Sequence, residues 1–336
     1  MNDRKRHASV TFLITLFLII GLLYQFGAQW LRHLLLYLSS ANWAKAIVSN
    51  SNMAWRVAGR FVAGEDISSA IIATRRLNQK GMRVTLDYLG ENVTHAQDAI
   101  DAHDHIIKLL DQIHAKKVEA TVSIKLSQIG LRIDEQLTFN NVRSLVEHAQ
   151  TLNNKIRIDM EESGTLETTL HIFHRLRFDH GFQNVGIVMQ SYLHRCEADV
   201  TQLIEEGASV RLCKGAYAEP AEVAFAEKAD TDQNYIKLTQ MLLSDTAHKN
   251  GVLFGAATHD DKMIEAIMAY TDANHIPKDA FEFQMLFGVR REMQERLVAQ
   301  GYQMRVYVPF GTAWYSYFIR RLAERPANLW FFLSNL

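Results

Sequence analysis

Residues 82–89 read Met-Arg-Val-Thr-Leu-Asp-Tyr-Leu, a β-rich run that opens a regular alternation of short strands and helical stretches. Seven further β-rich runs follow, at residues 118–126, 155–160, 184–190, 209–213, 252–258, 281–286 and 303–308. Each run precedes a stretch long enough for a helix, such as 141–152, 164–177 and 260–270. Eight such units predict an α/β fold of the (β/α)8 barrel type. A doubly wound open sheet is the alternative, but no Gly-x-Gly-x-x-Gly follows any run.

Composition sets the size and class of the protein. The chain has 336 residues, of which 48% are hydrophobic and 22% charged, with a net charge of −1. This length supports a large core in one barrel-sized domain or two smaller ones. The near-zero charge gives no electrostatic case for a nucleic-acid partner. The two cysteines, Cys196 and Cys213, show no metal-ligand spacing, which fits a reducing compartment.

The N-terminal 31 residues differ from the rest of the chain. Arg4-Lys5-Arg6 precedes an uncharged stretch at 8–31, long enough to span a bilayer, so we expect a membrane anchor or a membrane-surface helix. A helix packed on its own domain and a cleaved signal peptide are the alternatives. We divide the chain into this segment (1–31), N-terminal helices (32–81, including one at 66–79 that ends at Gly81) and the barrel with its C-terminal helix (82–336).

Polar and charged residues recur at the carboxyl ends of the expected strands. In a (β/α)8 barrel these ends form the active site, so their side chains are expected to share one pocket. They are Asp87, Glu91, Lys125, Asp159, Glu161, Glu162, Gln190, Arg211, Lys214, Thr258, His259, Glu282, Gln284 and Tyr307. Arg211, Lys214, Gln190 and His259 are mostly donors, suited to an anionic or carbonyl-rich cofactor, and the Lys214-Gly215-Ala216 loop permits close backbone approach to phosphate.

Two other chemistries are compatible with some of these residues. A Schiff-base lyase would use Lys125 or Lys214 as the nucleophile, and the sequence alone does not exclude it. A zinc hydrolase is less well supported, because the imidazoles of His103 and His105 fall on different sides of an expected helix. We therefore expect no metal site. A non-catalytic, membrane-anchored barrel is the third alternative.

A stripe of charged and aromatic residues follows the last expected strand. Tyr317, Arg320, Arg321 and Glu324 are spaced i, i+3, i+4 and i+7, so on a helix they share one face. Two guanidinium groups can hold a carboxylate bidentately, and the glutamate can offset an ammonium group. The stripe is therefore suited to binding an amino acid, although a solvated helix edge with internal ion pairs has the same spacing.

Ten segments, considered together, resemble the bacterial monofunctional proline dehydrogenases. The resemblance extends over about residues 30 to 332. The segments are 60–65, 86–91, 123–127, 157–162, 188–190, 210–217, 257–259, 282–286, 307–311 and 317–328.

The resemblance implies a distorted (β/α)8 barrel that binds FAD non-covalently. It implies oxidation of L-proline to 1-pyrroline-5-carboxylate, the first step of proline degradation to glutamate, with electrons passed to a membrane quinone. A separate pyrroline-5-carboxylate dehydrogenase would act downstream. A tyrosine at position 307, where hydroxyproline-oxidising relatives have a smaller residue, favours proline over 4-hydroxyproline.

The resemblance also implies roles for individual residues. Asp159 and Arg211 match catalytic positions, with Arg211 near the flavin N5. Arg320 and Arg321 match the pair that holds the proline carboxylate, aided by Lys125. Tyr307 and Tyr317 match tyrosines that pack on the pyrrolidine ring, and Glu324 would order the arginines. The flavin contacts implied are Met160, Gln190, Lys214, Gly215, Ala216, Thr258 and His259.

The N-terminal segment departs from the family pattern. A simple membrane span with Arg4-Lys5-Arg6 inside the cell would place the barrel outside the cytoplasm, where loading with FAD is difficult. We therefore expect the N-terminal helix to lie in or on the inner membrane, with the barrel at its cytoplasmic face.

Overall fold

The computed structural model describes residues 37, 55 and 58–324, with the backbone alone at 322–324. The hydrophobic segment at 1–31 and the helix expected near residues 32–45 therefore lie outside the described residues, apart from Tyr37. Among the helices described, none is long and apolar enough to cross a membrane. The chain divides into a larger unit, residues 61–312, and a smaller unit, residues 1–60 with 313–336.

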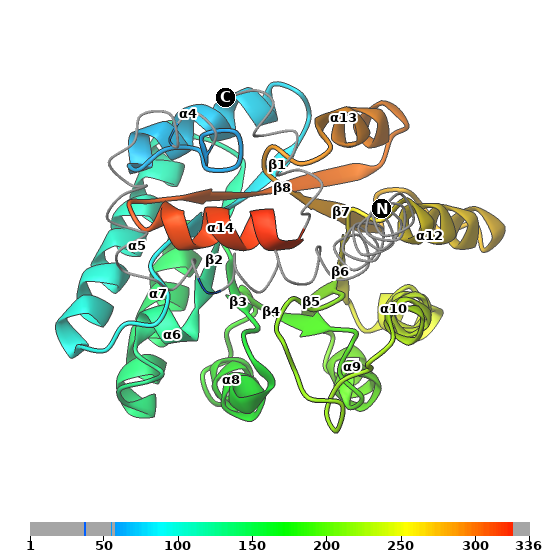
Figure 1. The fold of residues 1–336 in the computed structure, drawn as a ribbon, viewed down its shortest axis with the longest axis horizontal. Coiled ribbons are helices and arrows are strands. Elements are labelled where there is room, and N and C mark those ends of the chain that lie inside the picture. The colour runs from blue at the N-terminus through cyan, green and yellow to red at the C-terminus, as the bar shows by residue number, and fades with distance from the viewer. Residues whose placement is uncertain (1–36, 38–54, 56–57, 325–336) are drawn as a thin grey trace, which may run out of the picture. The chain divides into compact units, whose positions relative to one another are not determined.

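The larger unit contains a closed barrel of eight parallel strands, in which each strand pairs with the next and β8 closes onto β1 (Figure 1). The predicted barrel is confirmed, and the two strands at 209–213 and 281–286 have the predicted bounds. The strands are β1 (Arg83–Tyr88), β2 (Ala120–Lys125), β3 (Ile156–Asp159), β4 (Val185–Gln190), β5 (Ser209–Cys213), β6 (Leu253–Ala257), β7 (Phe281–Leu286) and β8 (Gln303–Phe310).

Helices surround the strands on the outside of this barrel (Figure 1). The helix predicted at 66–79 is confirmed as α4, with Asp66 as its N-cap accepting a hydrogen bond from the Ser69 amide. The helices of the larger unit are α4 (Ile67–Asn78), α5 (Ala96–Lys116), α6 (Leu126–Ile129), α7 (Glu135–Thr151), α8 (Leu166–His174), α9 (Cys196–Glu205), α10 (Lys228–Leu242), α11 (Asp245–Lys249), α12 (Asp261–Ala273) and α13 (Arg291–Ala299). A 3-10 turn, η1 (Ser163–Thr165), precedes α8, and a π turn, η2 (Arg175–Asp179), follows it.

The apolar core lies between the strands and the helices. In β1, Val84 and Leu86 are fully buried members of this core, while the alternate residues Thr85 and Asp87 are buried polar groups. The other strands repeat this period-two pattern, because successive side chains of a strand point to opposite faces. The outward face of the barrel is therefore sealed by helices, and its lumen receives the polar set.

Hydrogen bonds across the lumen confirm the direction of the polar side chains. Arg211 of β5 bonds to Ser123 of β2 and to Asp159 of β3, strands that do not pair with β5. Glycines make room for these long side chains. A Cβ at Gly255 would lie 2.2 Å from the Gln284 amide nitrogen, so no larger residue fits there without moving Gln284.

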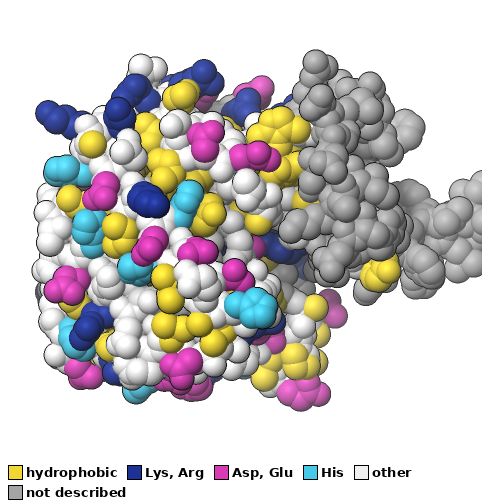
Figure 2. Space-filling model, turned by 90° about the vertical axis from the view of Figure 1, so that its left-hand side faces the viewer, with side chains coloured by type: hydrophobic (Ala, Val, Ile, Leu, Met, Phe, Trp, Pro, Cys, Tyr) yellow, Lys and Arg dark blue, Asp and Glu magenta, His cyan; other side chains and the backbone are white. Residues whose placement is uncertain are grey.

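The surface of the larger unit carries mixed charge. On the face shown in Figure 2, acidic and basic side chains are interspersed, with hydrophobic side chains in small groups among them. This pattern agrees with the net charge of −1.

The described part of the smaller unit is organised around α14 (Trp314–Glu324). Trp314 packs against Trp55, with ring centroids 5.1 Å apart, and against Phe318 one turn along the helix. On α14, the Arg321 guanidinium lies over the Tyr317 ring, 5.3 Å from its centroid. The spacing that predicted a shared helix face for these two residues is therefore confirmed.

Candidate active site

The carboxyl ends of β2, β3, β5 and β8 bring four of the predicted residues together: Lys125, Asp159, Arg211 and Tyr307. Asp159 is the shared partner. Its Oδ1 accepts a hydrogen bond from Arg211 Nη1 at 2.8 Å, and its Oδ2 accepts one from the Tyr307 hydroxyl at 2.7 Å. Both carboxylate oxygens are thus engaged by donors, so Asp159 fixes the positions of two side chains at once.

Lys125 is held as a cation. Its Nζ donates to both carboxylate oxygens of Asp87, at 2.8 and 2.9 Å, and to the Tyr307 hydroxyl at 3.2 Å. Burial lowers the pKa of Lys125, but the carboxylates of Asp87, Glu91 and Asp159 outweigh it and raise the pKa above its ordinary value. A Schiff-base nucleophile must be a neutral amine, so this environment is unsuited to Lys125 acting in a lyase.

Asp87 and Tyr307, which both accept a hydrogen bond from Lys125, are shifted toward their neutral forms. Burial raises the pKa of Asp87, with the charges of Asp159 and Glu91 adding to the effect against the opposing attraction of Lys125. Burial, followed by the charge of Asp159, raises the pKa of Tyr307 well above its ordinary value. Tyr307 therefore remains a phenol at any physiological pH and donates a hydrogen bond.

Arg211 has partners on more than one side. Besides Asp159, it donates from Nη1 to Ser123 Oγ at 3.2 Å and from Nε to Gln284 Oε1 at 2.5 Å. Gln284 in turn donates from Nε2 to Glu282 Oε1 at 2.6 Å. The guanidinium is therefore fixed in one plane, with its Cζ 5.1 Å from the centroid of the Tyr307 ring.

Lys214, in the loop after β5, forms ion pairs with two carboxylates. Lys214 Nζ lies 2.5 Å from Asp232 Oδ1 and 2.7 Å from Asp260 Oδ2, and Lys228 pairs with the same two aspartates. A lysine held by two carboxylates is not a free nucleophile, which removes the second lyase candidate. The following Gly215 has φ +119° and contacts the Tyr192 ring so closely that a Cβ would lie 2.4 Å from a ring carbon.

The remaining predicted cofactor residues lie at the ends of β3, β4 and β6. Gln190 donates from Nε2 to the Met160 carbonyl at 3.0 Å, which joins two predicted contacts. Its Oε1 is buried and has no hydrogen-bond partner among the described residues. His259 Nε2 accepts from the Leu286 amide at 2.9 Å, and Thr258 Oγ1 accepts from the Asp260 amide. Ala216 follows Gly215 in the same loop.

The predicted substrate residues Tyr317, Arg320, Arg321 and Glu324 lie on α14 of the smaller unit. The side chain of Glu324 is outside the described residues, so its pairing with the arginines stays a prediction. The roles assigned to all the site residues likewise stay predictions, although four of them form one cluster.

Several partners of the site were not assigned a role from the sequence. Asp87 and Gln284 were noted at strand ends, but their bonds to Lys125 and Arg211 were not predicted. The expectation that Glu282 lies at a carboxyl strand end was wrong: it is the second residue of β7, where it pairs with Arg305 at the other end of the barrel. Ser123 precedes Lys125 by two residues, and strand periodicity could have placed it on the same face. Asp232 and Asp260 come from different helical segments, and no sequence signal linked them to Lys214.

The fold and this cluster define a class of protein: a (β/α)8-barrel enzyme whose site, at the carboxyl ends of the strands, gathers paired cations and carboxylates around a phenol. A family model described as proline dehydrogenase matches residues 70–332. The chain belongs to the proline dehydrogenase family of enzymes.

Individual relatives agree with this assignment. The chain is 42% identical over 285 residues to proline dehydrogenase of Deinococcus radiodurans, covering 84% of this chain and 90% of that protein. It is 38% identical over 310 residues to proline dehydrogenase 1 of Bacillus subtilis strain 168, covering 91% of this chain and 99% of that protein.

A solved structure is also similar, that of proline utilization A from Bdellovibrio bacteriovorus inactivated by N-propargylglycine. The TM-score is 0.77 with 26% sequence identity, and the match covers 85% of this chain. The match covers 34% of that longer chain, so the likeness concerns one part of it.

The Lys214 cluster predicts a specific dependence of stability on pH. Burial raises the pKa of Asp260, but hydrogen bonds and charge from Lys214 and Lys228 more than offset this and lower it from 3.8 to about 2. A carboxyl whose pKa is lowered on folding stabilises the folded state above its unfolded pKa, and this stabilisation is lost as pH falls through the folded pKa. We expect Asp260→Asn to lower the free energy of unfolding by up to about 2 kcal/mol near neutral pH.

Urea unfolding of both proteins as pH is lowered from about 7 toward 3 measures this effect, and the difference between them should shrink over that range. Asn keeps the N-cap of α12, which the Asp260 carboxylate provides through the Lys262 amide. Asp134→Asn is the matched control, because Asp134 caps α7 in the same way without an ion pair among the described residues. A difference that is constant with pH would contradict the prediction.

Proposed function

We propose that this enzyme of proline oxidation converts L-proline to 1-pyrroline-5-carboxylate with FAD and passes the electrons to a membrane quinone. Proline oxidation, as a step of proline catabolism, follows from membership of the family. The observation that carries the finer proposal is the cluster of Lys125, Asp159, Arg211 and Tyr307 at the carboxyl ends of the barrel strands.

The residues present fit a flavin cofactor. The buried Gln190 Oε1 is an acceptor without a partner among the described residues, and so can receive an N–H of a bound ring system. Lys214 would supply a cation for the phosphate groups by exchanging one of its two carboxylate partners for them. Gly215 would contribute its backbone alone, because the Tyr192 ring occupies the space beside its Cα. When bound, FAD supplies the hydride acceptor. Met160, Thr258, His259 and Ala216 would complete its contacts.

The substrate is held by cations. Lys125 remains protonated, and we assign it with Arg320 and Arg321 to the proline carboxylate, because guanidinium groups bind carboxylates bidentately. Tyr307 and Tyr317 would contact the pyrrolidine ring. Arg211 is oriented by Asp159 and Gln284, so its charge is fixed before substrate arrives and requires no rearrangement during the reaction.

The cluster does not supply an evident base for the proline ammonium. Both Asp159 oxygens already accept hydrogen bonds, Tyr307 stays protonated, and Asp87 is buried and engaged by Lys125. Glu91 lies 3.7 Å from the Lys125 ammonium and is paired with it as well. We therefore propose that the amine reaches the site deprotonated or loses its proton to water.

We also propose a place in the cell and a downstream partner. The hydrophobic residues at 8–31 suit an N-terminal anchor at the cytoplasmic face of the inner membrane, where quinone is available. A separate pyrroline-5-carboxylate dehydrogenase would consume the product.

A spectroscopic titration tests the function. We expect the purified protein to absorb near roughly 450 nm and to lose this band when L-proline is added without oxygen. Arg320→Ala and Arg321→Ala should each raise the proline concentration for half-bleaching by about tenfold or more, because a charged hydrogen bond to the carboxylate is lost. The matched control is Arg76→Ala on α4, which should leave the titration unchanged. A colourless protein would refute the flavin, whereas bleaching insensitive to both substitutions would refute the carboxylate clamp alone.

The absence of an evident base predicts a rising pH profile. We expect kcat/KM for proline to increase between roughly pH 6 and 9, as the fraction of neutral amine grows. Steady-state rates with a soluble quinone analogue measure this. A flat profile over that range would show that a side chain takes the proton.

Fractionation tests the membrane proposal. Full-length protein should sediment with membranes, while a chain beginning at Gln29 should remain in the supernatant with its activity intact. Equal distribution of the two chains would refute the anchor.

A further inference from the structure

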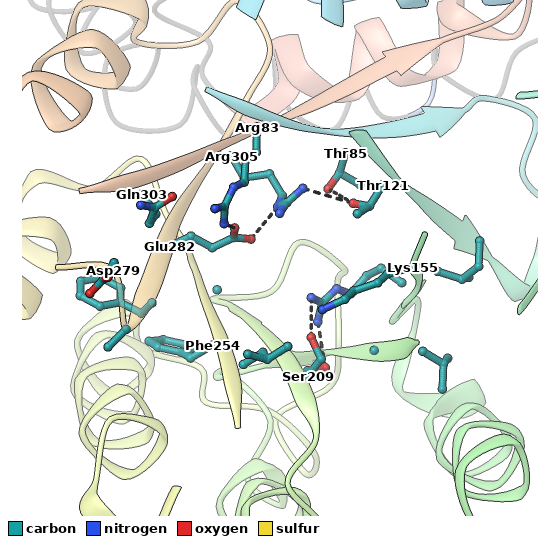
Figure 3. A pocket seen from close by; sticks show the side chains of 18 residues that line it. Arg83, Thr85, Thr121, Lys155, Ser209, Phe254, Asp279, Glu282, Gln303 and Arg305 are labelled. Carbon is teal, nitrogen blue, oxygen red and sulfur yellow. Dashed lines mark hydrogen bonds and ion pairs between the residues drawn. The ribbon is translucent and has the colours of Figure 1, made fainter. Parts of the chain in front are cut away.

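A charged cavity lies at the end of the barrel opposite the candidate active site, where the strands begin (Figure 3). We call it the basal cavity. Its volume is about 180 Å³, several times the roughly 30 Å³ that one water occupies in the liquid. Its charged lining residues are Arg83, Lys155, Arg157, Asp279, Glu282 and Arg305. Four cations thus face two carboxylates.

Counting the charges in the lumen identifies the cation without a counter-charge. Five basic side chains enter it from the described strands, and four have a carboxylate partner: Lys125 with Asp87 at 2.8 Å, Arg211 with Asp159 at 2.8 Å, Arg305 with Glu282 at 2.6 Å, and Arg83 with Glu282 at 4.0 Å. The fifth is Arg157. No carboxylate of the described residues lies within ion-pair distance of it.

The contacts of Arg157 are all with neutral groups. Its Nη1 donates to the carbonyls of Ile187 and Ser209, at 3.0 and 2.9 Å, and its Nη2 donates to Ser209 Oγ at 3.0 Å. A Cβ at Gly186 would lie 3.0 Å from Arg157 Cζ, so the glycine leaves the space that the guanidinium occupies. The position of the charge is therefore built into the strands.

The surroundings of Arg157 disfavour its positively charged form. Burial, followed by the charges of Arg211 and Arg305, lowers its pKa to about 9, with Glu282 opposing. Lys155 at the rim is affected in the same way, since burial and then Arg157 and Arg305 lower its pKa. An anion between these cations would relieve both effects.

We propose that the basal cavity binds a small oxyanion of the phosphate class, with Arg157 as its principal ligand and Lys155 and Arg83 at the entrance. The strands engage both N–H groups of Arg157 Nη1 and one of Nη2, which leaves Nε–H and the second Nη2–H to donate to two oxygens of a tetrahedral anion. The volume of about 180 Å³ is enough for one such group. The site lies outside the proposed proline and flavin sites, so it does not depend on the proposed function.

Calorimetric titration of the purified holoenzyme tests the proposal, with inorganic phosphate as the probe and sodium chloride at matched ionic strength as the reference. We expect saturable one-site binding of phosphate. Arg157→Gln should weaken it by about tenfold or more, since the charged hydrogen bonds to the anion are lost. Because Arg157→Gln removes buried bonds and could prevent folding, Lys155→Gln is the second variant, expected to weaken binding by about threefold. Lys108→Gln, on the exposed face of α5, is the control and should change nothing.

The source of the phosphate group is tested with glycerol phosphate. Tighter binding of this ester than of inorganic phosphate indicates a phosphorylated metabolite, and equal or weaker binding indicates the free ion. In crystals soaked with selenate, the anomalous peak should lie within hydrogen-bond distance of Arg157. The proposal is overturned if no saturable binding occurs, if chloride reproduces it, or if Lys155→Gln and Arg157→Gln bind phosphate as the unaltered protein does.

Discussion

The ion pair between Arg211 and Asp159 lies at the centre of a hydrogen-bonded chain that runs through the barrel. From Asp159 the chain passes to Arg211, then to Gln284, then to Glu282 and finally to Arg305. Removing one partner of a buried ion pair costs several kcal/mol, because the other charge is left in a medium of low polarity. Each member therefore fixes the next, and the geometry of the candidate active site depends on residues at the base of the barrel.

The lumen of the barrel can contain charged side chains because the apolar core lies outside it, between the strands and the helices. In barrels of this fold the interior is usually filled by layers of branched apolar side chains. Here residues such as Val84, Leu86 and Val306 provide the apolar packing on the outer face, against the helices. The hydrophobic effect thus stabilises the barrel from outside, and the lumen can be used for charge.

The eight strands could be predicted from the sequence because their signal is local. Each run is bounded by helical or turn residues, and the observed bounds differ from the predicted ones by no more than two residues, as for β2 at Ala120–Lys125 against 118–126. The helical stretches were less accurate. The helix predicted at 141–152 begins earlier, at Glu135, and the one predicted at 164–177 begins at Leu166 and ends in a π turn over Arg175–Asp179. A π turn depends on local backbone packing and leaves no periodic signal in the sequence.

The location of the candidate site could also be predicted, because a parallel barrel brings all its strand ends to one face. The hydrogen bonds and ion pairs within the candidate site could not be predicted, since they depend on three-dimensional distances and on burial. Lys125 illustrates the difference. Its sequence position was equally compatible with a nucleophile and with an anion-binding cation, and the three neighbouring carboxylates that raise its pKa come from two other strand ends and a loop. An amine in that field retains its proton, so the same contacts that order the cluster favour binding and orientation of an anionic substrate over covalent catalysis by the lysine.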